Sequence, residues 1–260
     1  MKALVTGASS GIGKDMALYL SKKGIDLILV GRNIDALNSV KDKCNTNVEI
    51  YDIDLSIEDN VYKFYEITKD KNIDILINNA GFGLFGNFID TDLNRELNMI
   101  RLNIVAVHIL TKLFLIDFVK RDKGYILNVA SSAGFMAGPK LSTYYSTKNY
   151  VLKETLAIYE ELRQMKSNVK ISCLCPGPVD TNFNNVAGGS FNTKSATSKY
   201  VAHYAIDKMF KNKLIIIPTI KMKLAIFGTR LLPTKLLLKI NYHIQNVKVK
   251  KYNKKSKEEK

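Results

Sequence analysis

Short apolar runs alternate with longer amphipathic stretches along most of the 260-residue chain. Each run is bounded by polar or glycine-rich segments and has the length of a buried strand. The predicted strands lie at residues 2–6, 26–30, 73–77, 125–129, 169–174 and 214–217. Strands that alternate with helices favour a parallel sheet with helices on both faces, which is a three-layer α/β fold. No linker interrupts this pattern, so we predict one domain over residues 1–217.

The pattern changes after Pro218, where Pro218 and Pro233 divide the tail into two candidate helices. Apolar residues recur there with helical spacing, at Leu224, Phe227, Leu231, Leu236, Leu237, Ile240 and Ile244. Cations are interspersed with them, namely Lys221, Lys223, Arg230, Lys235 and Lys239. We predict an amphipathic helical extension of the same domain over residues 218–247 and a disordered basic tail over residues 248–260.

The positive charge is concentrated in this tail. Residues 211–260 hold 14 Lys and Arg against 2 acidic residues, a net charge of +12 that leaves only +3 of the total +15 for the rest. A basic amphipathic helix can lie on an anionic membrane surface. Alternatively, its apolar faces pack on a neighbouring subunit or cover a substrate cleft. Nucleic acid is disfavoured as a partner, because the tail has few aromatic residues and no nucleic-acid motif.

A glycine-rich loop joins the first predicted strand to the first helix. Its sequence is Thr6-Gly7-Ala8-Ser9-Ser10-Gly11-Ile12-Gly13. A strand that passes through glycines into a helix N-terminus directs backbone N–H groups and the positive end of the helix dipole at a phosphate. In such a loop Gly7 allows the tight turn, Gly11 allows close approach of a pyrophosphate, and Gly13 allows the helix to pack on the strand.

Tyr144 and Lys148 form a candidate acid–base pair. One helical turn separates them, so both side chains leave the same helix face. A nearby ammonium favours the phenolate and is predicted to lower the pKa of Tyr144 towards neutrality. The neighbouring Tyr145 is followed four residues later by Asn149, which carries no charge. The spacing therefore selects Tyr144.

These features occur with further motifs in one order. The motifs are T-G-x-x-x-G-x-G at 6–13, Asn78-Asn79-Ala80-Gly81, Asn103, Ser131 with Gly134, Tyr144-x-x-x-Lys148, and Pro176-Gly177-x-Val179-x-Thr181. Together they resemble the short-chain dehydrogenase/reductase family over residues 1 to 181. The resemblance implies a single Rossmann-like, doubly wound domain, a nicotinamide cofactor, and a homodimer or homotetramer with subunit contacts through the helix near residues 99–119 and the helix that carries Tyr144.

The resemblance also implies a catalytic tetrad of Asn103, Ser131, Tyr144 and Lys148. In the implied mechanism Ser131 donates a hydrogen bond to a substrate carbonyl, Tyr144 gives the proton, and Lys148 binds ribose hydroxyls and with Asn103 holds a water relay. The alternative for Asn103 is a helix-bending residue satisfied by backbone. The S-x-x-G pattern selects Ser131, whereas Ser132 is expected to cap or bridge the turn.

Charge at the end of the second strand favours NADPH over NADH. The strand ends in Gly31-Arg32-Asn33, so a guanidinium suited to a 2′-phosphate stands where NAD enzymes place a carboxylate. Asp54, followed by Leu55, resembles the family's adenine-binding acid, although it could also cap the next helix. The resemblance assigns cofactor binding to Gly7, Ser9, Ser10, Gly11, Ile12, Gly13, Arg32, Asp54, Leu55, Asn79, Ala80, Gly81, Tyr144, Lys148, Pro176, Gly177, Val179 and Thr181.

The predicted substrate is a hydrophobic carbonyl compound, or the secondary alcohol in the reverse direction. Apolar residues expected near the nicotinamide are Phe82, Phe85, Phe88, Phe135, Met136 and Phe183. The pair Gly188-Gly189 indicates a mobile flap. A different hypothesis is a cofactor-binding regulatory or scaffold protein on a membrane surface, with little turnover. The presence of Ser131, Tyr144 and Lys148 together argues for the enzyme.

Other site classes find little support. Three cysteines form neither a C-x-x-C motif nor an even set, which indicates a reducing cytoplasm. No metal site is predicted, because His108, His203 and His243 are scattered. Residues 99–119 are apolar enough to resemble a membrane span, but charges interrupt them, and a buried interface helix is expected instead. The chain starts directly with the first strand, so we expect no leader and a cytoplasmic protein, peripheral at a membrane if the tail binds one.

Overall fold

The computed structural model describes residues 1–188 and 195–258. Seven parallel strands form one sheet in the order β3-β2-β1-β4-β5-β6-β9. The strands are β1 (Lys2–Thr6), β2 (Asp26–Gly31), β3 (Val48–Asp52), β4 (Ile75–Asn78), β5 (Tyr125–Val129), β6 (Lys170–Leu174) and β9 (Ile215–Ile216). A separate two-stranded parallel sheet pairs β7 (Val179–Asp180) with β8 (Ala196–Thr197). The predicted α/β class with a parallel sheet is confirmed.

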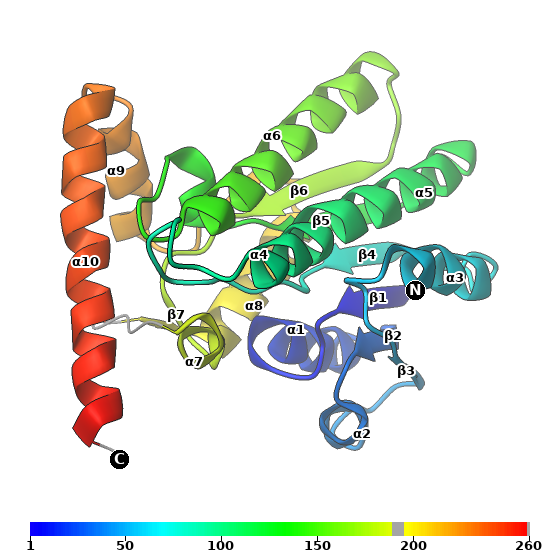
Figure 1. Ribbon diagram of the computed structural model, residues 1–260. Helices are drawn as coiled ribbons and strands as arrows, with labels where there is room; N and C mark the ends of the chain where they lie inside the picture. The colour runs from blue at the N-terminus through cyan, green and yellow to red at the C-terminus, as the bar shows by residue number, and fades with distance from the viewer. Residues whose placement is uncertain (189–194, 259–260) are drawn as a thin grey trace.

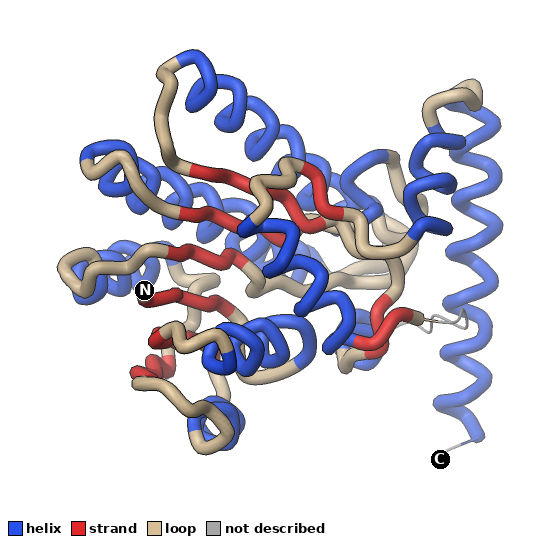
Figure 2. Tube along the Cα trace, turned by 180° about the vertical axis from the view of Figure 1, so that it is seen from behind, coloured by secondary structure: helices blue, strands red, loops and turns tan. Residues whose placement is uncertain are grey.

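Helices cover both faces of the sheet (Figures 1 and 2). One face carries α1 (Gly11–Lys22), α2 (Ile34–Lys41) and α8 (Ser198–Phe210), and the other carries α3 (Glu58–Thr68), α5 (Ala106–Lys120) and α6 (Ser142–Gln164). Side chains of one strand alternate between the two cores: Ala3 and Val5 of β1 join the first core and Leu4 joins the second. This alternation follows from the two-residue period of a strand, and it explains why the strands are apolar throughout.

The strand order reverses direction at β1. The chain moves from β1 outward to β2 and β3, then returns to β4 on the other side of β1 and continues outward. Crossovers on opposite sides of this point leave a crevice beyond the carboxyl ends of the strands. The glycine loop follows β1 directly, and Asn79-Ala80-Gly81 follow β4, so both motifs reach the crevice.

A long helical run passes along the second face. It comprises α4 (Leu93–Ile100), a π-helical turn η1 (Arg101–Val105) and α5. Within the described part of the chain, this run is the one helix long and apolar enough to cross a membrane, and 44% of its most apolar window is buried. Leu110, Phe114 and Phe118 of α5 pack into the second core. The run is therefore a core helix of the domain, and the predicted subunit contact through it stays a prediction.

The C-terminal helices α9 (Ile220–Thr229) and α10 (Thr234–Glu258) form a hairpin across the carboxyl ends of the strands (Figure 1). The two predicted helices and the break at Pro233 match this arrangement. Residues 248–258, for which disorder was predicted, continue α10 as helix, and residues 259 and 260 lie outside the described residues. Lysine and glutamate are good helix formers and no proline or glycine follows Pro233, which explains the continuation. Remaining short helices are η2 (Ser132–Phe135) and α7 (Phe183–Ala187).

Candidate active site

A cavity of about 900 Å³ occupies the crevice at the carboxyl ends of the strands. It extends from the glycine loop and the end of β2, past the ends of β4 and β5, to α6 and the α9–α10 hairpin. Every predicted cofactor-binding residue except Gly13 lines it, as do Ser131, Tyr144 and Lys148 of the predicted tetrad. Asn103 lies behind its wall. The structure thus gathers residues that are up to 174 positions apart in sequence, from Gly7 to Thr181.

The glycine loop packs tightly against the end of β4. Gly7 has φ +64, and a Cβ there would lie 2.9 Å from the Ala80 Cα. A Cβ at Gly13 would lie 2.4 Å from the Gly7 carbonyl oxygen and from Asn79 Nδ2. Both positions therefore require glycine. Since no side chain caps the first turn of α1, its N–H groups are left for an anion in the cavity.

Thr6 and Asn79 hold the two loops together. Thr6 Oγ1 accepts hydrogen bonds from the backbone N–H groups of Asn79 and Ala80, each at 2.9 Å. Asn79 Nδ2 donates to the carbonyl oxygens of Thr6 at 3.0 Å and Gly7 at 3.2 Å. This network fixes the shape of the phosphate-facing loop before any ligand binds.

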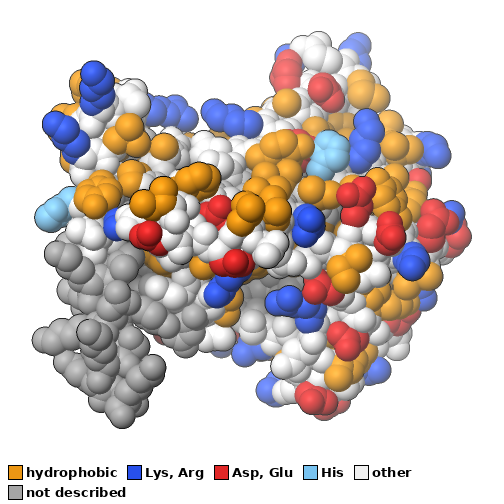
Figure 3. Space-filling model, in the orientation of Figure 1, with side chains coloured by type: hydrophobic (Ala, Val, Ile, Leu, Met, Phe, Trp, Pro, Cys, Tyr) orange, Lys and Arg blue, Asp and Glu red, His pale blue; other side chains and the backbone are white. Residues whose placement is uncertain are grey.

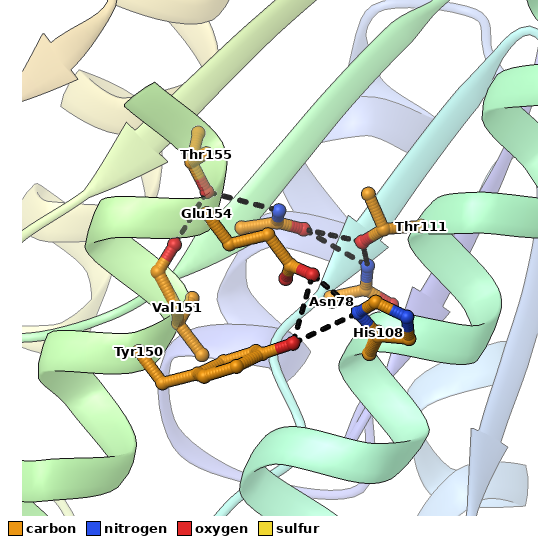
Figure 4. A network of polar contacts seen from close by, with 8 residues as sticks. Asn78, His108, Thr111, Tyr150, Val151, Glu154 and Thr155 are labelled. Carbon is orange, nitrogen blue, oxygen red and sulfur yellow. Dashed lines mark hydrogen bonds and ion pairs between the residues drawn. The ribbon is translucent and has the colours of Figure 1, made fainter. Parts of the chain in front are cut away.

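A buried polar network that the sequence analysis missed ties the strands to α5 and α6. Asn78 Nδ2 donates to Thr111 Oγ1 at 3.0 Å and to Asn128 Oδ1 at 2.9 Å. Asn128 Nδ2 in turn donates to Thr155 Oγ1 at 3.1 Å. Figure 4 shows Asn78, Thr111 and Thr155 converging from β4, α5 and α6. Polar residues inside otherwise apolar strands were the signal, because buried amides need partners.

Asn103 points inward from the π-helical turn η1. It is fully buried, its Oδ1 accepts from Phe82 N at 3.1 Å, and its Nδ2 donates to Phe82 O at 2.9 Å and Thr147 Oγ1 at 3.1 Å. A Cβ at Gly81 would lie 2.8 Å from Asn103 Oδ1 and 3.4 Å from Lys148 Nζ, so these two groups converge on Gly81. The Asn103 amide fixes the loop after β4 by hydrogen bonding to both backbone groups of Phe82. This matches the alternative prediction, in which backbone groups satisfy the Asn103 side chain. Its part in a water relay stays a prediction.

Ser131 and Tyr144 meet at the cavity wall. Burial raises the pKa of the Tyr144 phenol to about 12, against the opposing effect of the nearby Ser131 hydroxyl. The predicted fall of this pKa towards neutrality is therefore wrong, because burial outweighs any effect of the Lys148 charge. Ser131 Oγ also accepts from Ala133 N at 3.1 Å and caps η2. The turn is capped by Ser131, and Ser132 instead donates its backbone N–H to Pro176 O at 2.8 Å.

Lys148 lies deeper than Tyr144. Its Nζ donates to the carbonyl oxygen of Val129 at 2.8 Å and lies 6.0 Å from the centre of the Tyr144 ring. Burial lowers the pKa of Lys148 to about 8. At neutral pH the ammonium is still protonated, and one N–H is used by Val129 O. The remaining N–H groups are available to ligands on the cavity side.

The end of β2 carries Arg32, which is flanked in the sequence by Gly31 and Asn33. The Arg32 side chain is 62% exposed and its Nη1 lies 3.5 Å from Asp54 Oδ2. Burial acts to raise the pKa of Asp54, but hydrogen bonds from Ser56 and the charge of Arg32 outweigh it and lower that pKa. Asp54 Oδ1 accepts from Ser56 N at 2.9 Å and Ser56 Oγ at 2.7 Å. Asp54 therefore closes a turn rather than capping α3, whose N-cap is Ile57.

The α9–α10 hairpin contributes residues that the sequence analysis did not assign to the site. They are Met222, Asn241, Ile244 and Gln245. A Cβ at Gly177 would lie 2.4 Å from Met222 Cε, so α9 presses on the loop after β6. Of the open alternatives for the tail, covering a cleft is the one that this packing matches. The spacing of 241, 244 and 245 on one helix face was the available signal.

Two amides of α10 are buried against the cavity. Asn241 Nδ2 donates to Ala137 O at 2.7 Å. Gln245 is 1% exposed and its Nε2 donates to the Tyr145 hydroxyl oxygen at 2.6 Å. Gln245 Oε1 is buried and has no hydrogen-bond partner among the described residues. A buried carbonyl oxygen without a donor is costly unless a ligand supplies one.

The predicted aromatic lining is correct only in part. Phe82, Met136 and Phe183 line the cavity. Phe85 is instead buried in a small core with Leu141 and Ala187, and Phe135 packs on another core below α6. Phe88 is 67% exposed at the surface. Gly188 ends the described segment after α7 with φ +72, and Gly189 of the predicted flap lies outside the described residues.

Comparisons with known proteins agree with this geometry. The model of the short chain dehydrogenase family matches residues 1–189. An uncharacterized oxidoreductase of Staphylococcus epidermidis is 33% identical over 181 residues, which cover 69% of this chain and 78% of that protein. The very-long-chain 3-oxoacyl-CoA reductase of Rattus norvegicus is 32% identical over 170 residues, which cover 62% of this chain and 54% of that protein.

Solved structures show the same fold. A short-chain dehydrogenase from Sphingobium yanoikuyae in complex with NADPH superposes with a TM-score of 0.79 at 27% identity, covering 88% of this chain and 93% of that chain. A short-chain dehydrogenase/reductase from Burkholderia phymatum in complex with NAD also gives a TM-score of 0.79, at 22% identity, covering 86% and 91%. The second likeness is one of fold alone.

Proposed function

The chain belongs to the short-chain dehydrogenase family and is an oxidoreductase, and from this premise we propose that it uses NADPH to reduce a hydrophobic carbonyl compound. The reverse oxidation of a secondary alcohol uses the same groups. The observation that carries the proposal is the placement of Ser131, Tyr144 and Lys148 in one cavity with the glycine loop.

The chain's own residues suit a nicotinamide dinucleotide. The uncapped N-terminus of α1 and the glycine loop are complementary to a pyrophosphate, and the protonated Lys148 offers N–H groups to ribose hydroxyls. We assign the predicted cofactor contacts at the ends of β2, β4 and β6 to the same dinucleotide, from Arg32 to Thr181. When bound, this cofactor supplies the hydride that the protein itself cannot provide.

The protein groups then manage the proton and the developing charge. Ser131 donates a hydrogen bond to the substrate carbonyl oxygen, and Tyr144 transfers its phenolic proton to that oxygen as the carbonyl carbon accepts hydride. A phenol with a pKa of about 12 is fully protonated at neutral pH, which suits a proton donor. The nearby Lys148 ammonium stabilises the phenolate left behind, and Asn103 holds the wall beside it.

NADPH preference rests on Arg32. Its guanidinium is exposed beside the cavity at the end of β2, where a 2′-phosphate lies when the adenosine half follows the fold. Arginine binds phosphate with a fork of donors and a permanent charge. Asp54 tempers this attraction, because its carboxylate already lies 3.5 Å away. The preference is measured as the ratio of kcat/KM for NADPH and NADH.

The substrate half of the cavity favours an apolar ketone or acyl chain. Its apolar side chains are Phe82, Met136, Leu141, Phe183, Val186, Met222 and Ile244. The partial likeness to a very-long-chain 3-oxoacyl-CoA reductase supports this class. Gln245 adds one polar position, since its unpaired Oε1 accepts a hydrogen bond from a hydroxyl or amide of the substrate.

We also propose a cytoplasmic homodimer or homotetramer that assembles through the outer faces of α5 and α6. His108, Tyr150 and Glu154 form a hydrogen-bonded group on these faces (Figure 4). Ile116 is 41% exposed and Tyr159 is 37% exposed in a single chain. Light scattering coupled to gel filtration measures the assembly.

A carbonyl screen that follows NADPH absorbance tests the function. Tyr144→Phe removes the transferable proton and keeps the ring, so it should bind NADPH as the wild type does and lose reduction. Equal reduction rates for the wild type and Tyr144→Phe on every substrate of the screen would instead support the regulatory or scaffold hypothesis.

A further inference from the structure

The outer side of the α9–α10 hairpin is apolar and exposed. Ile220, Leu224 and Phe227 are 73, 67 and 61% exposed and follow helical spacing along one face of α9, and Leu231, in the turn after α9, is 70% exposed. The apolar surface continues over the turn and onto α10 through Leu232, Leu236 and Ile240, which are 38 to 46% exposed. We call these seven residues the hairpin surface. Figure 3 shows apolar and basic side chains together on this part of the molecule, at the upper left.

The opposite side of the same helices is buried. Met222 and Ile226 of α9 point towards the domain, where Met222 contacts Gly177 and Ile226 is 4% exposed. Asn241 and Gln245 of α10 line the cavity. The hairpin therefore has one face that covers the cleft and a second apolar face that stays exposed among the residues that the structure describes.

Cations surround the hairpin surface. Lys221, Lys223, Arg230, Lys235 and Lys239 are all exposed, and none makes an ion pair with a residue that the structure describes. The last fifty residues carry +12 of the chain's +15 charge. Residues 211–257 contain no acidic side chain, so no carboxylate within this segment offsets the charge of these cations.

We propose that the hairpin surface docks on an anionic lipid bilayer, with its apolar residues among the acyl chains and its cations at the headgroups. Each cation near an anionic bilayer strengthens binding by roughly fivefold, and the apolar side chains add to this. The connecting turn leads directly into α10, because the Pro233 carbonyl oxygen accepts hydrogen bonds from the backbone N–H groups of Leu236 and Leu237.

The positive charge around the hairpin surface favours an anionic bilayer over a second copy of the chain as its partner. A twofold interface places the same patch on both partners, so it would bring the five cations of each copy together without carboxylates between them. Nucleic acid would neutralise the cations but leave the apolar residues in water. An anionic bilayer satisfies both kinds of side chain at once.

Docking of the hairpin on a bilayer would also affect how substrate reaches the cavity, and this consequence rests on the proposed function. The hairpin that meets the bilayer also lines the cavity through Met222 and Ile244. An apolar carbonyl dissolved in the membrane would thus reach the cleft beside the docked helices, without crossing bulk water.

Vesicle sedimentation of the full-length protein tests the docking. The probes are vesicles of phosphatidylcholine alone and of phosphatidylcholine with phosphatidylglycerol, at low and high salt. The wild type should bind the anionic vesicles, less at high salt, and bind the neutral ones weakly. Leu224→Ser with Phe227→Ser and Leu231→Ser should reduce partitioning at least tenfold. The combined substitutions Lys221→Gln, Lys223→Gln, Lys235→Gln and Lys239→Gln should reduce partitioning by about 100-fold or more.

A matched control replaces an exposed apolar residue and a lysine on α3, as Ile67→Ser with Lys63→Gln. Ile67 is 50% exposed, and both residues lie far from the hairpin in sequence. This control should bind as the wild type does, and circular dichroism establishes that all variants are folded. Because binding is measured without turnover, failure of the proposed reaction leaves this test intact.

Three outcomes would overturn the proposal. The first is wild-type protein that sediments no better with anionic than with neutral vesicles. The second is hairpin variants that bind vesicles as well as the wild type. The third is serine variants that change the oligomeric state while the wild type ignores vesicles, which would assign the surface to a second copy.

Discussion

Replacing Lys148 with methionine should abolish turnover and yet stabilise the ligand-free protein. The residue is 5% exposed, and burial lowers its pKa from 10.5 to about 8. A buried base with a lowered pKa is one whose charged form the fold disfavours. Methionine has a similar length and fills the same space without a charge.

The magnitude follows from the two pKa values. At pH 7 the ammonium is retained in both folded and unfolded chains, and the difference in pKa corresponds to about 3 kcal/mol of destabilisation of the fold. The variant also loses the hydrogen bond to Val129 O, whose unpaired carbonyl costs about 1–2 kcal/mol. The net gain for Lys148→Met is about 1–2 kcal/mol, which raises Tm by about 2–8 °C.

The pH dependence of stability distinguishes removal of the buried Lys148 charge from an effect of better packing by methionine. Between pH 8 and 10.5 the unfolded wild type binds more protons at Lys148 than the folded protein does, so wild-type stability rises with pH in this window. The variant has no such group. The difference in the free energy of unfolding between Lys148→Met and the wild type should therefore fall by about 2 kcal/mol between pH 7 and pH 9.5.

Urea unfolding of both proteins at the two pH values, followed by circular dichroism, measures the difference. All other titrating groups are shared and cancel in the comparison. A variant that is less stable than the wild type at pH 7, with a gap that stays constant at pH 9.5, would refute the account of a buried, destabilising ammonium.

Three further predictions concern other parts of the cavity. Arg32→Ala should lower kcat/KM for NADPH about tenfold, at the lower end of the range for an exposed charge-assisted contact, and leave NADH unchanged; equal losses with both would contradict the assignment. Gln245→Leu should raise KM about tenfold for a substrate with a hydroxyl or amide beside its apolar chain and change kcat little, and steady-state kinetics with and without that polar group provide the check. Gly13→Ala places a Cβ 2.4 Å from Gly7 O and should cost about 1–3 kcal/mol, seen as a lower Tm; an unchanged Tm would show that the loop can relax.

Local patterns predicted the fold because the strands are buried on both faces. Continuous apolar runs mark such strands directly, and the glycine loop between β1 and α1 needs only adjacent residues. The helix break at Pro233 was equally local. The resemblance added the order of the motifs, and most of the residues it selected line one cavity.

The errors arise where a property depends on packing between distant segments. Spacing brings Lys148 close to Tyr144, but the direction of the phenol pKa depends on burial, which no local pattern reports. Phe88 and Phe82 look alike in sequence, whereas the first is exposed and the second lines the cavity. Gln245 meets Tyr145 across 100 residues of chain, and only the placement of α10 reveals that contact.

The catalytic residues and the α9–α10 hairpin that lines the cavity are separate segments of the chain, which affects how such an enzyme can acquire new substrates. Proton transfer is assigned to Tyr144 of α6, with Ser131 between β5 and η2 beside it. The hairpin that follows the last strand instead contributes Met222, Ile244 and Gln245 to the cavity. Exchange of this terminal segment by recombination would give the same hydride chemistry a new ligand range and a new cellular surface in one step. Grafting the hairpin onto a related scaffold offers protein engineers the same route.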